Sequence, residues 1–353
     1  MLPKIPRVLR LAPLAILLCS CKMVVMQPSG DVAVQQRDLI VVSTILMLLI
    51  IVPVIALTLF FAWRYRQSNA VATYDPEWHH STRLEVIIWA APPPIIVALG
   101  ALTWVGSHLL DPYRPIDRID ASHPLTAATT SLKVDVVALD WKWLFIYPDQ
   151  GIATVNELAA PVNVPIDFQI TASSVMNSFS IPALAGQVYA MPGMVTQLHA
   201  VINAPGVYDG FSANYSGAGF SDMQFKFYGL SQADFDRWIT VAKTSGGGAL
   251  SRKEYLSLAQ PSQKVPVHRY ATIDAHLYQA VADQCVDPGQ MCMSEMRHVD
   301  AQGGLGLAGV YGVGTRADAQ PLAPGGHRPQ QKYVLAFCTP AEPTGRPPQP
   351  QLR

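Results

Sequence analysis

The chain has 353 residues, as many acidic as basic side chains, and a formal net charge of zero. This balance leaves no electrostatic footprint for binding nucleic acid. Half of the residues are hydrophobic and only 14% are charged, well below the roughly 25% of soluble domains. The composition therefore argues against an ordinary soluble protein and predicts membrane segments.

The N-terminus has the features of a secretory signal. Basic residues precede the apolar stretch Leu11–Leu18, which is too short to cross a bilayer. Cys21, with the small residue Ser20 before it, resembles the cleavage site of a bacterial lipoprotein. We expect a signal peptide at 1–20 and a lipid-anchored segment at 21–38, with a lipid such as palmitate on Cys21. Ordinary signal cleavage nearby and an uncleaved anchor are the alternatives.

Two uncharged runs follow, at 39–63 and 86–107. Each is long enough for a transmembrane helix, which needs about 20 apolar residues. The loop between them, 64–85, carries three arginines and is expected in the cytoplasm, so the rest of the chain lies outside. The run Pro92–Pro94 would distort a lone helix, which favours packing against another protein helix; the alternative is a broken helix without a partner.

The external part begins with a β-rich region at 112–230. Short runs of strand-forming residues alternate with turn residues, which predicts a β-sandwich or a Greek-key barrel. Trp141 and Trp143 would share one side of a strand. They are interpreted as core, as a subunit interface, or as a point where electrons enter, and the core and interface interpretations are favoured.

A helical extension is predicted at 231–300, followed by a Gly/Pro-rich tail at 301–353. Cys285 and Cys292 lie close in sequence, and outside the cytoplasm they favour a disulfide. A metal-binding pair is the alternative, but it has no companion pair. Cys338 would then be left unpaired.

The loop from Ser212 to Met223 has the spacing of a dinuclear copper site, C-x3-C-x3-H-x2-M, with different chemistry. Ser212 and Ser216 stand where two cysteines would bridge the metals, and Phe220 stands where a histidine would bind. Upstream, Val175–Phe179 resembles the segment that carries the other histidine of such sites, and Asn177 stands at that place. Copper of this type needs thiolate and imidazole ligands, so with only Met223 retained no metal is expected. The alternative is a surface loop with a chance methionine.

No nucleophile elbow, phosphate loop, zinc motif or haem-attachment motif occurs in the sequence. We therefore expect neither catalytic residues nor cofactor-binding residues on this chain.

Taken together, these features resemble subunit II of the haem–copper terminal oxidases, most closely the bo-type ubiquinol oxidases of proteobacteria. The likeness covers roughly residues 15–285. The stretches that carry it are Leu84–Trp89, Asp140–Pro148, Gln150–Glu157, Val175–Phe179 and Tyr208–Phe225.

The resemblance implies a two-helix membrane hairpin and a periplasmic sandwich of the cupredoxin fold. It implies a non-catalytic subunit of a proton-translocating ubiquinol oxidase in the bacterial inner membrane. Its partners would be subunit I, which would carry the haems and the copper, and smaller membrane subunits. Electrons would pass from ubiquinol to subunit I, which reduces oxygen to water.

Two other functions are weighed against this one. A cytochrome c oxidase subunit with active copper conflicts with the lost cysteine and histidine positions. A free-standing, membrane-anchored cupredoxin-like lipoprotein could act as a binding or assembly factor. Acylation already anchors such a protein, so the two additional spans favour an oxidase subunit.

Overall fold

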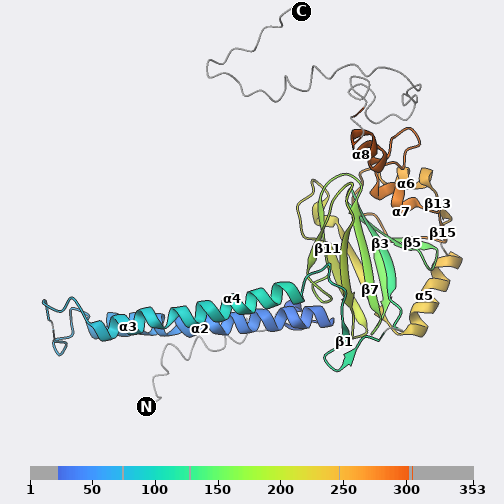
Figure 1. The fold of residues 1–353 in the computed structure, drawn as a ribbon. Coiled ribbons are helices and arrows are strands. Elements are labelled where there is room, and N and C mark those ends of the chain that lie inside the picture. The colour runs from blue at the N-terminus through green and yellow to red at the C-terminus, as the bar shows by residue number, and fades with distance from the viewer. Residues whose placement is uncertain (1–22, 74, 127–128, 246, 302–303, 305–353) are drawn as a thin grey trace, which may run out of the picture.

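The computed structural model describes residues 23–73, 75–126, 129–245, 247–301 and 304. A long helical hairpin projects from a β-sandwich, and short helices pack on the other sides of the sandwich (Figure 1). The predicted signal peptide, Cys21, Cys338 and nearly all of the predicted tail lie outside the described residues.

The hairpin consists of α2 (Asp31–Arg64), α3 (Thr82–Ala90) and α4 (Pro92–Leu109), after the short helix η3 (Val24–Met26). Both arms are long and apolar enough to cross a membrane, and their most apolar windows bury no residue within this chain. The predicted span 86–107 is interrupted at Ala91, directly before the proline run. The prolines begin α4, where their missing N–H groups cost no helical hydrogen bond.

The outer end of the hairpin is tied to the sandwich. The backbone N–H groups of Ser29 and Gly30 both donate to the carbonyl oxygen of Ala183 at 2.9 Å. In the first turn of α2, the buried carboxylate of Asp31 accepts a hydrogen bond from the guanidinium of Arg118 at 2.9 Å. These contacts fix the hairpin on the sandwich edge formed by β9 (Gln187–Ala190) and β10 (Thr196–Val201).

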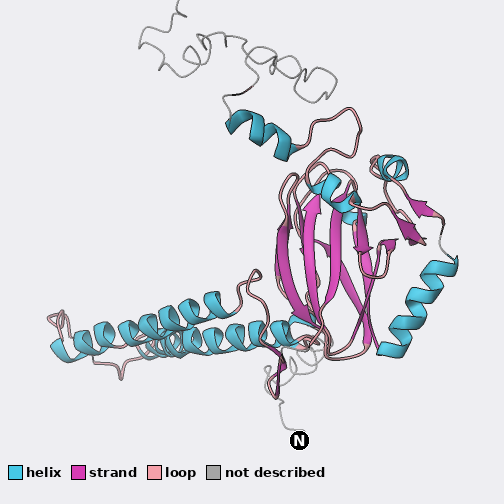
Figure 2. Ribbon diagram, turned by 45° about the vertical axis from the view of Figure 1, so that its right-hand side comes forward, coloured by secondary structure: helices cyan, strands magenta, loops and turns pink. Residues whose placement is uncertain are grey.

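Two sheets form the sandwich (Figure 2). The six-stranded sheet has the order β10, β7 (Pro165–Ala172), β3 (Leu132–Leu139), β4 (Lys142–Tyr147), β5 (Ile152–Val155) and β14 (His268–Tyr270). The five-stranded sheet has the order β6 (Glu157–Pro161), β12 (Gln224–Leu230), β11 (Gly206–Ser212), β8 (Asn177–Ser180) and β9. Pairs β3–β7 and β6–β12 are parallel, and the other pairs in these two sheets are antiparallel.

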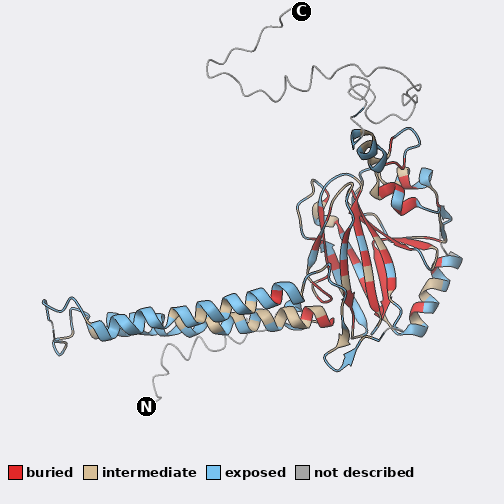
Figure 3. Ribbon diagram, in the orientation of Figure 1, coloured by how far each residue is buried: buried red, intermediate tan, exposed pale blue. Residues whose placement is uncertain are grey.

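Aromatic side chains fill the space between the sheets, where Figure 3 shows the buried residues gathered. Trp143 packs edge-on against Phe179 with ring centroids 5.3 Å apart, and Phe179 stacks on Phe225 at 5.6 Å. Such pairs stabilise a core by about 0.5–1.5 kcal/mol each beyond the burial of their area. Strands β9 and β12 alternate between buried and more exposed residues, whereas β4, β5, β6 and β8 are buried along their whole length.

The chain changes sheet at Asn156, between β5 and β6. This residue has a φ of 56°, a left-handed conformation that asparagine tolerates better than most residues. Its side chain accepts a hydrogen bond from the backbone N–H of Trp143 at 2.9 Å and donates one to the carbonyl of Val265 at 2.8 Å. The corner is thus held by a buried carboxamide.

The C-terminal extension covers one outer face. It contains α5 (Gln232–Ser245), β13 (Ala249–Leu250), α6 (Arg252–Leu258), β15 (Thr272–Ile273), α7 (Leu277–Ala282) and α8 (Met293–Ala301). Tyr255 of α6 and Leu277 and Val281 of α7 form a second core with Leu139 and Leu144 of the six-stranded sheet.

The outer face of the five-stranded sheet is different. Val207 and Phe211 of β11 and Tyr189 of β9 remain exposed there. Among the described residues, this sheet has no helical layer comparable to α6 and α7. Two further short strands, β1 (Arg118–Asp120) and β2 (His123–Pro124), connect the hairpin to the sandwich.

Candidate functional site

The candidate site lies at one end of the five-stranded sheet. Ser212 ends β11, Met223 directly precedes β12, and Asn177 begins β8, which is paired with β11. The loop between Ser212 and Met223 contains the short helix η4 (Phe220–Asp222). Adjacent strands therefore bring together positions that are 35 residues apart in sequence.

Asn177 and Ser212 form a buried polar pair. The hydroxyl of Ser212 donates to the carboxamide oxygen of Asn177 at 3.0 Å, and both residues are at most 3% exposed. The amide group of Asn177 donates to the carbonyl of Val175 at 3.2 Å. Neutral groups thus satisfy each other at two of the positions where the copper spacing would place ligands.

The other three positions differ in burial and contacts. Met223 is 1% exposed and its side chain belongs to the core, while its carbonyl accepts from the N–H of Ser212 at 3.2 Å. Phe220 is half-buried and its ring packs against the exposed ring of Tyr215 at 5.7 Å. The buried hydroxyl of Ser216 has no hydrogen-bond partner among the described residues.

Trp141 covers this loop from the turn between β3 and β4. Its indole N–H donates to the carbonyl of Ser216 at 2.9 Å. A Cβ atom added to Gly219 would lie 2.5 Å from the indole, and one added to Gly217 would lie 3.0 Å from it. The two glycines allow the ring to lie directly on the loop, a contact that the sequence analysis did not anticipate.

The two tryptophans differ in burial. Trp143 is fully buried between the sheets, and Trp141 packs against the same core cluster while staying partly buried. Trp141 lies outside the strand because the turn includes it, and it is only partly buried. It keeps an accessible edge beside the loop.

Lys142, between the two tryptophans, is also buried. Its ammonium group donates to the carbonyls of Asp140 and Gln260, at 3.0 and 2.9 Å, and to the hydroxyl of Ser262 at 2.6 Å. Burial lowers the pKa of this lysine. Its three hydrogen bonds connect the turn that carries Trp141 to the segment after α6, so the ammonium group has a structural role.

An apolar rim surrounds the buried polar pair. Val175 and Met176 precede β8 and are about two-fifths exposed, and Tyr215 is three-quarters exposed. The side chain of Asn214 donates to the carbonyl of Met176 at 3.3 Å and so joins the two loops. Three exposed apolar side chains therefore lie beside the candidate site at this end of the sandwich.

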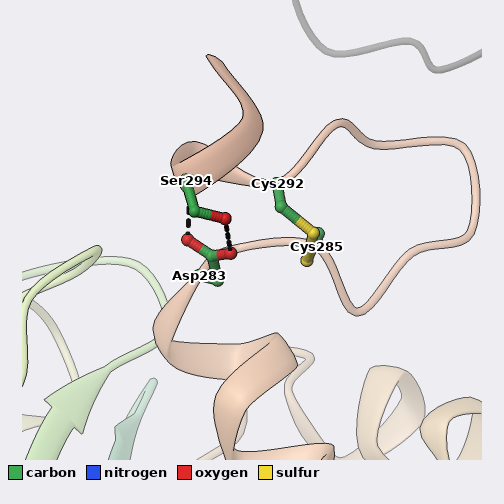
Figure 4. The surroundings of a disulfide bond; sticks show 4 residues. All are labelled: Asp283, Cys285, Cys292 and Ser294. Carbon is green, nitrogen blue, oxygen red and sulfur yellow. Dashed lines mark hydrogen bonds between the residues drawn. A yellow bond between two sulfur atoms is a disulfide. The ribbon is translucent and has the colours of Figure 1, made fainter. Parts of the chain in front are cut away.

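Cys285 and Cys292 lie apart from this site, in the loop between α7 and α8, where the structure joins them in a disulfide (Figure 4). The carboxylate of Asp283 accepts hydrogen bonds from the backbone N–H of Ser294, at 2.8 Å, and from its hydroxyl. Together these contacts attach the start of α8 to the end of α7.

Comparisons with known proteins agree with this architecture. Residues 150–227 match the family described as the periplasmic domain of cytochrome c oxidase subunit II. Residues 244–289, which contain α6 and α7, match the family described as the COX aromatic rich motif.

Relatives match over most of their length. Cytochrome bo(3) ubiquinol oxidase subunit 2 of Pseudomonas putida is 47% identical, covering 79% of this chain and 86% of that protein. Its counterpart in Pseudomonas aeruginosa is 46% identical over 84% of this chain and 83% of that protein. Ubiquinol oxidase subunit 2 of Acetobacter aceti is 49% identical over 78% and 87%, respectively. The chain therefore belongs to the ubiquinol oxidase subunit 2 family, with a sandwich of the oxidase subunit II type.

Proposed function

We propose that this chain is the second, non-catalytic subunit of a membrane-bound ubiquinol oxidase. In this complex, electrons would pass from ubiquinol to a haem–copper subunit I, which reduces oxygen to water and translocates protons. The observation that carries the proposal is the Asn177–Ser212 pair, which fills two of the copper-ligand positions with neutral hydrogen-bonded groups in a chain of this family.

The residues at the candidate site do not fit copper. A serine hydroxyl keeps its proton at neutral pH and is a poor bridging ligand, whereas dinuclear copper needs thiolates and imidazoles. The hydroxyl of Ser212 is already engaged with Asn177, and the core holds the thioether of Met223. We derive no electron-transfer step through this chain.

A lipid-soluble donor makes an external relay unnecessary. Ubiquinol reaches subunit I from within the membrane, so electrons need not cross the periplasmic sandwich. The sandwich can then persist without a metal because its aromatic core, with Trp143 and Phe179 in contact, is held by side-chain packing, to which Met223 of the loop contributes.

The contribution of this chain is to hold and cover subunit I. Its hairpin buries no residue of its most apolar windows within the chain, so these surfaces are free to pack against lipid and against other membrane helices. The exposed Val207 and Phe211 of the five-stranded sheet provide an apolar surface outside the membrane. We place the sandwich in the periplasm and the hairpin in the inner membrane, with a lipid on Cys21 as a second anchor.

The proposal is tested by purifying the complex through a tag on this chain and measuring its haem and copper content. We expect a haem-bearing subunit to copurify, and copper in the amount of one ion per complex, which belongs to subunit I. If the complex contains more than one copper ion, and the additional copper is lost when Met223 is replaced, this chain binds a metal. Purification without any haem protein would favour a free-standing lipoprotein.

A further inference from the structure

A cavity of about 290 Å³ lies where the hairpin meets the sandwich. Its walls come from the first two turns of α2, the segment that follows α4, and the β9–β10 edge of the sandwich. The candidate site contributes no residue to it. We propose that this cavity binds the headgroup of a zwitterionic, amine-bearing phospholipid from the outer leaflet of the membrane.

The position of the cavity matches the headgroup layer. Gln35 and Gln36 line it four and three residues before the uncharged run that starts at Leu39, or about 5–6 Å along the helix axis. On the other arm, Leu109 and Leu110 line it just past the uncharged run that ends at Ser107. Headgroups occupy about 5–8 Å on each side of the hydrocarbon core, so both arms place the cavity at that depth.

The walls carry charges of both signs. The lining includes the carboxylates of Asp31, Asp111 and Asp117 and the guanidinium groups of Arg114 and Arg118. A purely basic pocket would select an anionic lipid. Here the carboxylates repel a headgroup with a net negative charge and can pair with an ammonium group. The guanidinium groups can bind the phosphate of the same headgroup.

Asp31 and Arg118 form the fixed part of this site. The side chain of Asp31 is 7% exposed, and one of its oxygens accepts from Arg118 at 2.9 Å and from Gln35 at 2.7 Å. Arg118 uses only its Nε atom for this bond, so its two terminal nitrogens have no partner among the described residues. They remain available as donors for phosphate, and the side chain is about one-third exposed.

His199 provides a further polar group in the wall. Its Nδ1 atom is paired with the carboxylate of Asp167 at 2.7 Å, and its other ring nitrogen has no hydrogen-bond partner among the described residues. The apolar side chains of Leu109 and Leu198 complete the lining. A polar headgroup with the start of its glycerol and acyl chains suits such a mixed surface.

The site is tested by the lipids retained by the intact complex. The double variant Asp31→Asn/Arg118→Gln removes both charges together and keeps a polar side chain at each position, and so leaves no unpaired buried carboxylate. The complex is purified in mild detergent, stripped, incubated with equal amounts of phosphatidylethanolamine and phosphatidylglycerol, and analysed by native mass spectrometry. The control is Asp234→Asn/Arg237→Gln, an exposed ion pair at 2.8 Å in α5.

We expect the wild type and the control to retain phosphatidylethanolamine in preference to phosphatidylglycerol. In the cavity variant, retention should fall about tenfold for each charged hydrogen bond lost. Equal retention by the cavity variant and the control would overturn the proposal, and so would preference for phosphatidylglycerol.

A second measurement keeps the wild-type charges. Gln187, an exposed residue of the lining, is replaced with the photoreactive p-benzoylphenylalanine, and the complex is irradiated in membranes. A phospholipid adduct on this chain supports the proposal. An adduct only with another subunit would show that protein fills the cavity and would overturn it, while leaving the proposed role in the oxidase intact.

Discussion

The hydroxyl of Ser212 and the carboxamide oxygen of Asn177 are hydrogen-bonded at 3.0 Å in a site shielded from solvent. Each residue satisfies the other, so the pair stabilises the loop without a metal. At these two copper-ligand positions the side chains therefore make a structural contact. Removing this hydrogen bond should affect the stability of the protein and leave electron transfer unchanged.

Ser212→Ala should therefore destabilise the protein by about 1–3 kcal/mol, because the oxygen of Asn177 would stay buried without a donor. We expect a lower thermal unfolding midpoint of the purified complex. Oxygen uptake with ubiquinol, measured below that midpoint, should equal that of the wild type. Ser221→Ala, at an exposed serine of the same loop, is the matched control. A loss of turnover at unchanged stability would assign Ser212 a role in electron transfer.

Copper binding should return when the donors return. The variant Asn177→His/Ser212→Cys/Ser216→Cys/Phe220→His restores thiolate and imidazole beside the retained Met223. We expect a copper pair on this chain, measured as additional copper by elemental analysis. The same variant without the two cysteine substitutions is the control and should gain none. Failure of the full variant to bind copper in a folded complex would show that the loop has lost the ligand geometry as well as the ligands.

Gly219 should not tolerate a side chain while Trp141 is present. A Cβ atom would lie 2.5 Å from the indole, and overpacking of this kind costs about 1–3 kcal/mol. Gly219→Ala should lower the thermal unfolding midpoint when Trp141 is present. When Trp141 has already been replaced with alanine, Gly219→Ala should lower the midpoint much less. If the two substitutions are additive, the ring and the loop are not in contact.

Asp135 should make stability depend on pH. Burial, with some repulsion from Asp149, raises its pKa from the ordinary 3.8 to about 6. The folded state therefore holds the proton more tightly than the unfolded state, and stability should fall as pH rises from about 4 to about 6 and then level off.

Replacing this carboxyl should remove that dependence. Asp135→Asn should raise the unfolding midpoint at pH 7.5 and leave it unchanged near pH 4, with Asp149→Asn as a weaker control. The full difference is at most about 3 kcal/mol, from two pKa units at 1.36 kcal/mol each. If the thermal unfolding midpoint of the wild type instead rises between pH 4 and pH 6, the predicted loss of stability with rising pH is wrong.

The bond between Cys285 and Cys292 should protect both thiols in the purified protein. Alkylation followed by peptide mass spectrometry should modify them only after reduction. The double variant with serine should lose about 2–3 kcal/mol, as expected for a short closed loop, chiefly through release of α8 and faster proteolysis there. Labelling of both thiols without reduction would show that they are free.

The β-sandwich and the hairpin were predictable because local patterns determine them. Long uncharged runs indicate spans, and short alternating runs between turn residues indicate strands. Pro92 was harder to interpret, because one proline run can break a helix or begin one. Its position after Ala91 becomes meaningful only when two separate helices are seen.

The contacts of the candidate site were less predictable, because they depend on pairs distant in sequence. The copper spacing identified Ser212 and the resemblance of Val175–Phe179 identified Asn177, but neither showed the hydrogen bond between them. Strand periodicity placed Trp141 and Trp143 on one side, and both belong to the same core cluster, but it did not show that Trp141 lies in the turn and is only partly buried. Lys142 gave no sign of burial, since two of its three acceptors come from residues 118 and 120 positions later.

The most direct test of the proposed function is oxygen uptake by the complex purified through a tag on this chain. A short-chain ubiquinol is supplied in one assay and reduced cytochrome c in the other. We predict uptake with ubiquinol and none with cytochrome c, because the Asn177–Ser212 pair offers no external electron relay. Rapid uptake with cytochrome c would contradict the account.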